Sequence, residues 1–196
     1  MYWNRVRAFG AYGVLLSFCI LAPSMAQADE NEVWALLKKP GHFALLRHAN
    51  APGSTAEPYG INLKDCSIQR SLDDAGRTQA RHLGAEFHKH GIVKARLVSS
   101  QFCRALETAR LLGLGTPQEL PTLNLVYLAD IGKLRDTSAA AIAYMKKMPQ
   151  NQVVVLVSHE PNIQGIANVD LSSGELAVAH FDAAGAVAVD GRIMVK

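Results

Sequence analysis

Three apolar runs in the sequence end in polar side chains that could do chemistry. Arg47 and His48 follow residues 43–46, Ser99, Ser100 and Arg104 follow residues 95–98, and His159 follows residues 153–157. Any one of these could be an ordinary strand end, with a solvated arginine or a histidine whose hydrogen bonds are satisfied. If the three runs are strands of one open α/β sheet, however, their polar residues meet at the edge where such sheets bind ligands.

Phosphoryl transfer is the chemistry that needs this set of two guanidinium groups and two imidazoles. Arginine forks match phosphate oxygens in pairs, and helix N-termini add amide donors and a partial positive charge. A neutral imidazole can attack phosphorus and hold it covalently. Enzymes lower the barrier to phosphate-monoester hydrolysis by up to roughly 29 kcal/mol, mainly through positioning and positive groups around the equatorial oxygens. The set therefore predicts phosphoryl transfer without a metal.

The periodicity of the chain predicts strands that alternate with helices, which favours an α/β fold with a mainly parallel sheet. Extended chain is expected over residues 43–46, 95–98, 122–128, 153–157, 176–181 and 186–189, and helices over residues 32–39, 103–113, 137–148 and 161–168, with a further helix that ends at Gly91. Ser71 or Asp73 would cap that further helix, and Asp136 the helix over 137–148. Residues 51–64 form a long loop directly after His48, where groups that contact substrate often lie.

Residues 1–28 have the pattern of a secretory signal peptide. Arg5 and Arg7 precede an apolar stretch over residues 8–22, which is short for a membrane span, and an A-x-A cleavage site occupies residues 26–28. A membrane anchor is the alternative. Cleavage predicts one mature domain over residues 29–196, located in the periplasm or secreted, with no stable membrane span.

Charge and composition narrow the class of protein further. The chain has 196 residues, of which 49% are hydrophobic and 19% charged, so one domain with a sizeable core is expected. Without the two arginines of the leader, 18 basic residues face 17 acidic ones, a formal charge of +1. A nucleic-acid-binding domain needs a basic stripe and a pI above about 9, so no nucleic-acid partner is expected.

Two cysteines, Cys66 and Cys103, remain after the leader is removed. In an oxidising compartment they could form one disulfide, and the alternative is two buried thiols. Neither has a C-x-x-C partner for zinc. The histidines at 82, 88 and 90 do not form an H-E-x-x-H pattern and are interpreted as a solvated helix face.

The sequence resembles the histidine phosphatase superfamily, which contains phosphoglycerate mutases and histidine acid phosphatases. Four pieces carry the resemblance: residues 46–49 (Leu-Arg-His-Ala); Leu72, Gly76, Gln79 and Ala80; Ser99, Ser100, Cys103, Arg104, Ala105, Thr108 and Ala109; and residues 157–159 (Val-Ser-His). The resemblance runs from about Phe43 to Pro161. It implies a three-layer α/β/α sandwich, His48 as the nucleophile that becomes phosphohistidine, and Arg47, Arg104 and His159 as the pocket for the phosphoryl group. It implies no metal and no cofactor.

The general acid departs from the family pattern. Mutase-like members place a glutamate after the second arginine motif, where residues 120–136 here offer only Asp130 and Asp136. Acid-phosphatase-like members place an aspartate directly after the second histidine, where this chain has Glu160. Glu175, in the loop after the last catalytic helix, is a further candidate. Glu160 and Glu175 are expected ahead of Asp130, although each could be an ordinary helix-start or hairpin residue.

Two functions are compatible with these residues. The first is an exported phosphatase acting on a small phosphomonoester or a phosphorylated envelope component. The second is a non-catalytic phosphate-binding or envelope-interaction protein on the same fold, which the absence of a clear general acid keeps open.

Overall fold

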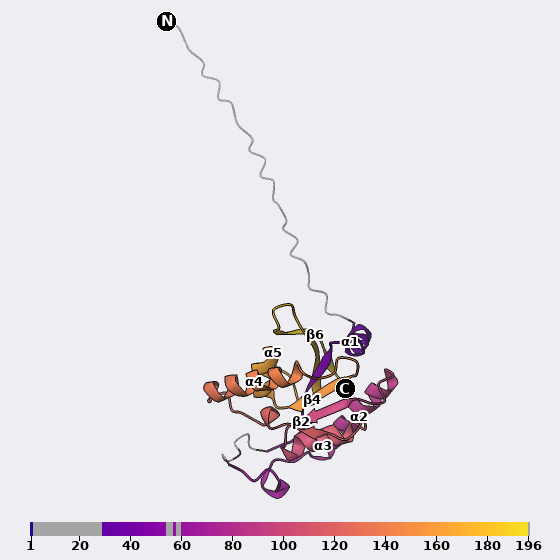
Figure 1. Ribbon diagram of the computed structural model, residues 1–196, viewed down its shortest axis with the longest axis vertical. Coiled ribbons are helices and arrows are strands. Elements are labelled where there is room, and N and C mark those ends of the chain that lie inside the picture. The colour runs from indigo at the N-terminus through magenta and orange to yellow at the C-terminus, as the bar shows by residue number, and fades with distance from the viewer. Residues whose placement is uncertain (2–28, 54–56, 58–59, 196) are drawn as a thin grey trace.

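A computed structural model describes residues 1, 29–53, 57 and 60–195 of the chain (Figure 1). Within these residues one sheet is formed by β1 (Phe43–Arg47), β2 (Arg96–Ser99), β3 (Gln118–Glu119), β4 (Val154–Ser158), β5 (Glu175–Phe181) and β6 (Val187–Met194). The α-helices are α1 (Glu30–Leu37), α2 (Asp74–Lys89), α3 (Cys103–Leu111), α4 (Ile131–Met145) and α5 (Glu160–Ala167), with 3-10 turns at Cys66–Ile68 and Pro121–Leu123.

The strand order is β3-β2-β4-β1-β5-β6. The first four strands in this order are mutually parallel, whereas β5 is antiparallel to β1 and β6 is antiparallel to β5. This confirms the mainly parallel sheet. Because β2, β4 and β1 are neighbours, their carboxyl ends lie side by side, as the sequence predicted.

Helices cover both faces of the sheet, so the three-layer α/β/α sandwich is also confirmed. In Figure 1, α4 and α5 lie on one side of the strands and α2 and α3 on the other. Successive strand residues point to opposite faces: Leu46 belongs to the core shared with α1, α2 and α3, and Leu45 to the core shared with α4 and α5. Trp34 of α1 packs edge-on against Phe87 of α2, with 4.9 Å between the ring centroids.

The start of α2 packs directly on the chain that follows His48. Asp73 caps the helix by accepting a hydrogen bond from the Gly76 amide at 2.6 Å, and Asn50 donates to the other Asp73 oxygen at 3.0 Å. A Cβ at Gly76 would lie 2.0 Å from the Asn50 carbonyl oxygen. Only glycine therefore permits this close approach, which fixes the backbone beside the site.

Two predictions about the middle of the chain were wrong. The helix expected from residue 137 begins at Ile131, because Asp130 rather than Asp136 caps it by accepting from the Lys133 amide at 3.1 Å. Residues 122–128 are not a strand. Side chains bond their backbone instead: Asn162 accepts from the Val126 amide and donates to the Asn124 carbonyl, so these groups need no strand partner.

Cys66 and Cys103 form a disulfide, with 5.7 Å between their Cα atoms and a sequence separation of 37 residues. The bond joins the segment after the long loop to the first residue of α3. The Gln69 side chain makes a second link by accepting a hydrogen bond from the Cys103 amide at 3.0 Å. Arg104, the next residue, is therefore held at the start of a doubly attached helix.

We expect the Cys66→Ser/Cys103→Ser variant to lose about 4 kcal/mol of unfolding free energy, from the loop-closure entropy of a 37-residue separation. Urea denaturation of the variant and of the wild type, with and without reductant, measures this. Reduced wild type should match the variant. A loss below about 1 kcal/mol in both would show that the disulfide does not constrain the unfolded chain as expected.

The predicted signal peptide lies outside the described residues. Among the residues that the structure describes, no helix is long and apolar enough to cross a membrane.

Candidate active site

The ends of β1, β2 and β4 bring three of the predicted side chains into direct contact. Arg104 donates from Nε to His48 Nε2 at 3.1 Å and from a terminal nitrogen to His159 Nδ1 at 3.4 Å. The two imidazole ring centroids are 5.2 Å apart. All three side chains are buried, Arg104 completely. Residues separated by up to 111 positions in the chain thus form one cluster because their strands are neighbours.

His48 is held as a neutral imidazole of defined tautomer. Its Nδ1 lies 2.8 Å from the Ala49 carbonyl oxygen, which can only accept, so Nδ1 carries the proton and Nε2 presents its lone pair toward Arg104. Burial, followed by the Arg104 charge, lowers the pKa of His48 to about 3. The lone pair of Nε2 is therefore available as a nucleophile well below neutral pH.

His159 has the opposite arrangement of nitrogens. Its Nδ1 accepts from Arg104, which leaves Nε2 to donate to Ser100 Oγ at 2.8 Å. Ser100 Oγ in turn donates to the Asn124 side chain at 3.2 Å. Burial, with the nearby His48 and Arg104, lowers the pKa of His159 well below its ordinary value. This network fixes the ring against the site.

Two arginines at the site carry buried nitrogens with no hydrogen-bond partner in the described structure. Arg47 donates to the Leu171 carbonyl at 2.8 Å through one terminal nitrogen, but its Nε is unpaired. Arg70 likewise donates to the Ala51 carbonyl at 3.0 Å and has an unpaired Nε. Buried unpaired donors are costly, so these two point to an anionic ligand. Burial lowers the pKa of Arg47, and Glu160 opposes that shift.

Arg70 and Glu57 are site residues that sequence analysis missed. Arg70 acts electrostatically on Arg47, His48, Arg104 and His159. Glu57 accepts from Arg104 at 2.8 Å and from the Arg70 amide at 3.0 Å, through the same oxygen. Burial lowers the pKa of Arg104, and its bond to Glu57 opposes that effect. The only signal for Glu57 was its place in the long loop after His48.

Two further motif residues hold the backbone around His48. Thr108 accepts a hydrogen bond from the Ala49 amide at 3.0 Å and donates to the Arg104 carbonyl at 2.7 Å. Gln79 accepts from the Asn50 amide at 3.0 Å and donates to the Ser173 carbonyl at 2.8 Å. Both tie the chain after β1 to a neighbouring element and keep the nucleophile in register with the pocket.

The three candidate acids lie in different surroundings. Glu160 begins α5 beside Arg47; burial raises its pKa, Arg47 opposes this, and Asp170 adds to it. Both oxygens of Glu175 are engaged, one by Arg192 Nε at 2.7 Å and one by the Ser172 amide at 2.8 Å. Asp130 caps α4. Glu160 is therefore the candidate whose surroundings best suit a proton donor.

The two buried histidines should make the fold less stable in acid. The unfolded chain binds a proton at His48 near pH 6.5, whereas the folded chain does so only near pH 3. Between these values the unfolded state holds more protons, so unfolding free energy falls as pH falls, by up to about 1.4 kcal/mol per pH unit for each such histidine. Above pH 6.5 this contribution is constant.

The His48→Gln variant should therefore have a shallower loss of stability than the wild type between pH 6.5 and pH 4, as measured by urea denaturation. His88→Gln, which alters an exposed histidine on α2, is the matched control and should keep the wild-type slope. Equal slopes for all three proteins would contradict the burial of a neutral His48.

Comparison with known proteins gives one family match. Residues 43–126 match the model of the histidine phosphatase superfamily, branch 1. No curated protein matches the chain.

Solved structures share the fold at low sequence identity. One is an open reading frame product of Mycobacterium tuberculosis (18% identity, TM-score 0.57, covering 76% of this chain and 94% of that one). Another is the protein histidine phosphatase SixA in complex with tungstate (17% identity, TM-score 0.55, covering 78% of this chain and 96% of that one). A third is a phosphoserine phosphatase of Entamoeba histolytica with phosphoserine (14% identity, TM-score 0.58, covering 77% of this chain and 95% of that one).

The matched segment includes Arg47 and two members of the buried cluster, His48 and Arg104. Its boundaries begin at β1 and extend past α3, so they include two of the three strand ends that form the site. The motifs, the fold and this match over residues 43–126 together show that the chain is similar to the histidine phosphatase superfamily.

Proposed function

We propose that the protein is a phosphatase that hydrolyses a phosphomonoester through a phosphohistidine intermediate on His48. The observation that carries this is the neutral His48, whose Nε2 lone pair faces the buried Arg104 guanidinium, with His159 5.2 Å away. The presence of phosphatases among structures of the same fold supports it. A binding protein would gain nothing from a nucleophile in a fixed tautomer.

The reaction proceeds in two displacements. His48 Nε2 attacks phosphorus, the bond between phosphorus and the substrate oxygen breaks, and that oxygen takes a proton from a general acid. A water molecule then attacks the phosphorus of phosphohistidine, gives up a proton to the same group, and inorganic phosphate leaves with His48 restored. The guanidinium groups of Arg47 and Arg104 stabilise the charge of the equatorial oxygens in both steps, and His159 holds Arg104 in place.

Glu160 is proposed as the general acid. Burial raises its pKa, which keeps it protonated over more of the acidic range. Because His48 stays neutral to about pH 3, the competent pair of neutral imidazole and protonated carboxyl exists at mildly acidic pH. Hydrolysis of substrates with poor leaving groups should therefore decline as pH rises and Glu160 loses its proton.

We expect Glu160→Gln to slow hydrolysis of an alkyl phosphate such as glycerol phosphate by about 10²-fold or more, because general acid catalysis is worth about 10²–10⁴. p-Nitrophenyl phosphate, whose leaving group needs no proton, should be affected far less in kcat/KM, which does not include the later hydrolysis of phosphohistidine. Glu175→Gln is the matched control and should leave the ratio of the two rates unchanged. An equal reduction of kcat/KM for both esters in Glu160→Gln would exclude Glu160 as the acid.

The substrate phosphoryl group must compete with Glu57 for Arg104. The Glu57 carboxylate already accepts a hydrogen bond from one terminal nitrogen of that guanidinium at 2.8 Å. It therefore occupies a position where a phosphoryl oxygen of the substrate would bind. We propose that the substrate is a small phosphorylated molecule or a phosphorylated envelope component, met in the periplasm or outside the cell after the leader is cleaved. The loop that carries Glu57 would select among such substrates.

The experiment that tests the function is an assay of purified protein with p-nitrophenyl phosphate and a panel of phosphorylated metabolites and envelope sugars, with and without EDTA. Turnover that EDTA does not reduce is expected. Phosphate binding without turnover of any ester would favour the alternative, a phosphate-binding or envelope-interaction protein on this fold.

A further inference from the structure

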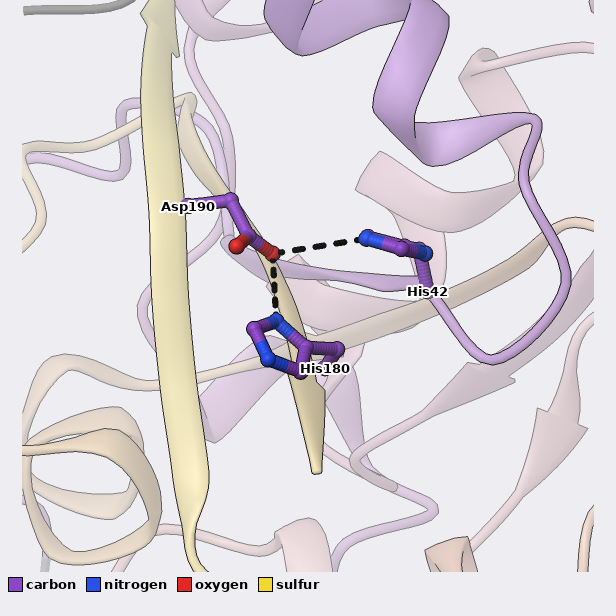
Figure 2. Close-up of side chains that lie close together, drawn as sticks. All are labelled: His42, His180 and Asp190. Carbon is purple, nitrogen blue, oxygen red and sulfur yellow. Dashed lines mark hydrogen bonds and ion pairs between the residues drawn. The ribbon is translucent and has the colours of Figure 1, made fainter. Parts of the chain in front are cut away.

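A second cluster of histidines lies away from the active site, on the antiparallel side of the sheet. Figure 2 shows His42 and His180 directed at one carboxylate oxygen of Asp190. His180 Nδ1 is 2.9 Å and His42 Nε2 is 3.7 Å from that oxygen, and the three ligand atoms all lie within 4.8 Å of one another. Among the described residues, this is the only group of three or more histidine, cysteine or acidic side chains so arranged.

The backbone builds this cluster from three neighbouring strands. Phe43 of β1 pairs with Ala179 of β5, so His42 and His180 are the next residues along that antiparallel register and meet across it. Asp190 belongs to β6 at a bulge: Val189 pairs with Ala179 and Gly191 with Val178, which leaves Asp190 as the extra residue. Bulges re-aim side chains and are frequent beside functional sites.

We propose that His42, His180 and Asp190 bind a Zn²⁺ ion. Two imidazole nitrogens and a carboxylate are a usual zinc ligand set, and tetrahedral zinc at about 2.1 Å from each ligand separates ligand atoms by about 3.4 Å. The two imidazole nitrogens lie 2.9 and 3.7 Å from the Asp190 oxygen and within 4.8 Å of each other, so a small movement of the rings gives this spacing. The Pro40 carbonyl lies 3.4 Å from His42 Nδ1. It can accept the Nδ1 proton, which leaves the Nε2 lone pair for metal, the usual outer-shell arrangement.

The site is open to solvent and remote from the reaction. The side chains of His42, Asp190 and His180 are 17%, 19% and 37% exposed, so an ion can enter and a water can complete its coordination. His42 precedes β1 and His48 follows it, about 20 Å apart at about 3.3 Å per residue. The ion would therefore join three neighbouring strands and would not take part in phosphoryl transfer. Lys146 lines the same hollow, and its positive charge opposes the binding of a cation there.

Calorimetric titration of untagged protein with ZnCl₂ tests the proposal. One Zn²⁺ per chain is expected to bind, and Zn²⁺ at 100 times its Kd should raise Tm by about 5–10 °C. MgCl₂ should give no response, because Mg²⁺ prefers oxygen ligands. His180→Ala and Asp190→Asn should each raise the Kd for Zn²⁺ by at least about 100-fold, because losing even an outer-shell partner lowers metal affinity by 10- to 100-fold.

Controls separate this site from other histidines. His82→Ala should bind Zn²⁺ like the wild type, because His82 and His90 approach different oxygens of Glu86, at 4.0 and 3.8 Å, and these three side chains do not form a group with the spacing that a metal ion needs. Asp190→Asn keeps the side-chain shape, so its circular dichroism and metal-free Tm show whether any loss of binding reflects misfolding. Zinc binding that survives in His180→Ala and Asp190→Asn but is lost in His48→Ala would place the ion at the active site and overturn the proposal, as would the absence of binding to the wild type.

Discussion

His48→Ala should reduce turnover of p-nitrophenyl phosphate by about 10³-fold or more, because it removes the atom that forms the covalent intermediate. No other described side chain offers a replacement. His159, the nearest imidazole, is held on both sides of its ring, because Nδ1 accepts from Arg104 and Nε2 donates to Ser100. Steady-state kinetics of the purified variant measure the loss.

Rapid quenching distinguishes loss of the nucleophile from loss of the pocket. Wild type mixed briefly with a radiolabelled phosphomonoester should carry acid-labile label on histidine, and His48→Ala should carry none. His159→Ala should be slower than the wild type but still become labelled, because His48 Nε2 is intact. Label on His48→Ala, or undiminished turnover in it, would overturn the phosphohistidine mechanism.

The grouping of Arg47, His48, Arg104 and His159 was predictable because the signal for each residue lies in the few residues around it. Each residue follows an apolar run, and the carboxyl ends of parallel neighbouring strands must lie at one edge of the sheet. The sequence does not state the strand order, but alternation of strands and helices restricts it strongly. The pairing of β1 with β4 and of β4 with β2 then places Arg104 within hydrogen-bond distance of His48 and His159.

Glu57 and Arg70 were not predictable on the same grounds. Neither follows an apolar run, and the contact of Glu57 with Arg104 spans 47 positions between a loop and a helix. Loop conformation depends on tertiary partners, here the disulfide to Cys103 and the Tyr127 hydroxyl, which donates to the Glu57 carbonyl at 3.0 Å. No periodicity in the sequence encodes those partners.

The ranking of the acid candidates also depended on tertiary contacts that the sequence does not show. Sequence placed Glu160 and Glu175 near the site with equal weight, and both do begin elements that border it. What separates them is the ion pair between Glu175 and Arg192, which follows from the register of β5 and β6. Register of a hairpin is set by its turn and its bulge, and the bulge beside Val178 could not be inferred from composition.

Glu57→Ala should lower the unfolding free energy by about 3–5 kcal/mol, because it leaves the buried Arg104 charge without its partner. The same change frees Arg104 for a phosphoryl group. Inorganic phosphate or tungstate should therefore raise the Tm of Glu57→Ala more than that of the wild type, since a ligand that replaces the lost carboxylate binds the folded variant more tightly. Thermal unfolding across a phosphate titration measures both effects.

Two further variants make this prediction decisive. Arg104→Ala removes the cation, so phosphate should raise its Tm least of all, and kcat/KM should fall by about 10²-fold or more. Glu107→Ala is the control, because it breaks a partly exposed ion pair with Arg77 that has a similar separation of 2.7 Å. It should lower the unfolding free energy by at most about 1 kcal/mol and leave the rise of Tm with phosphate unchanged. If phosphate stabilised Glu57→Ala and the wild type equally, Glu57 would be a structural partner of Arg104 only, and substrate would reach the pocket without displacing it.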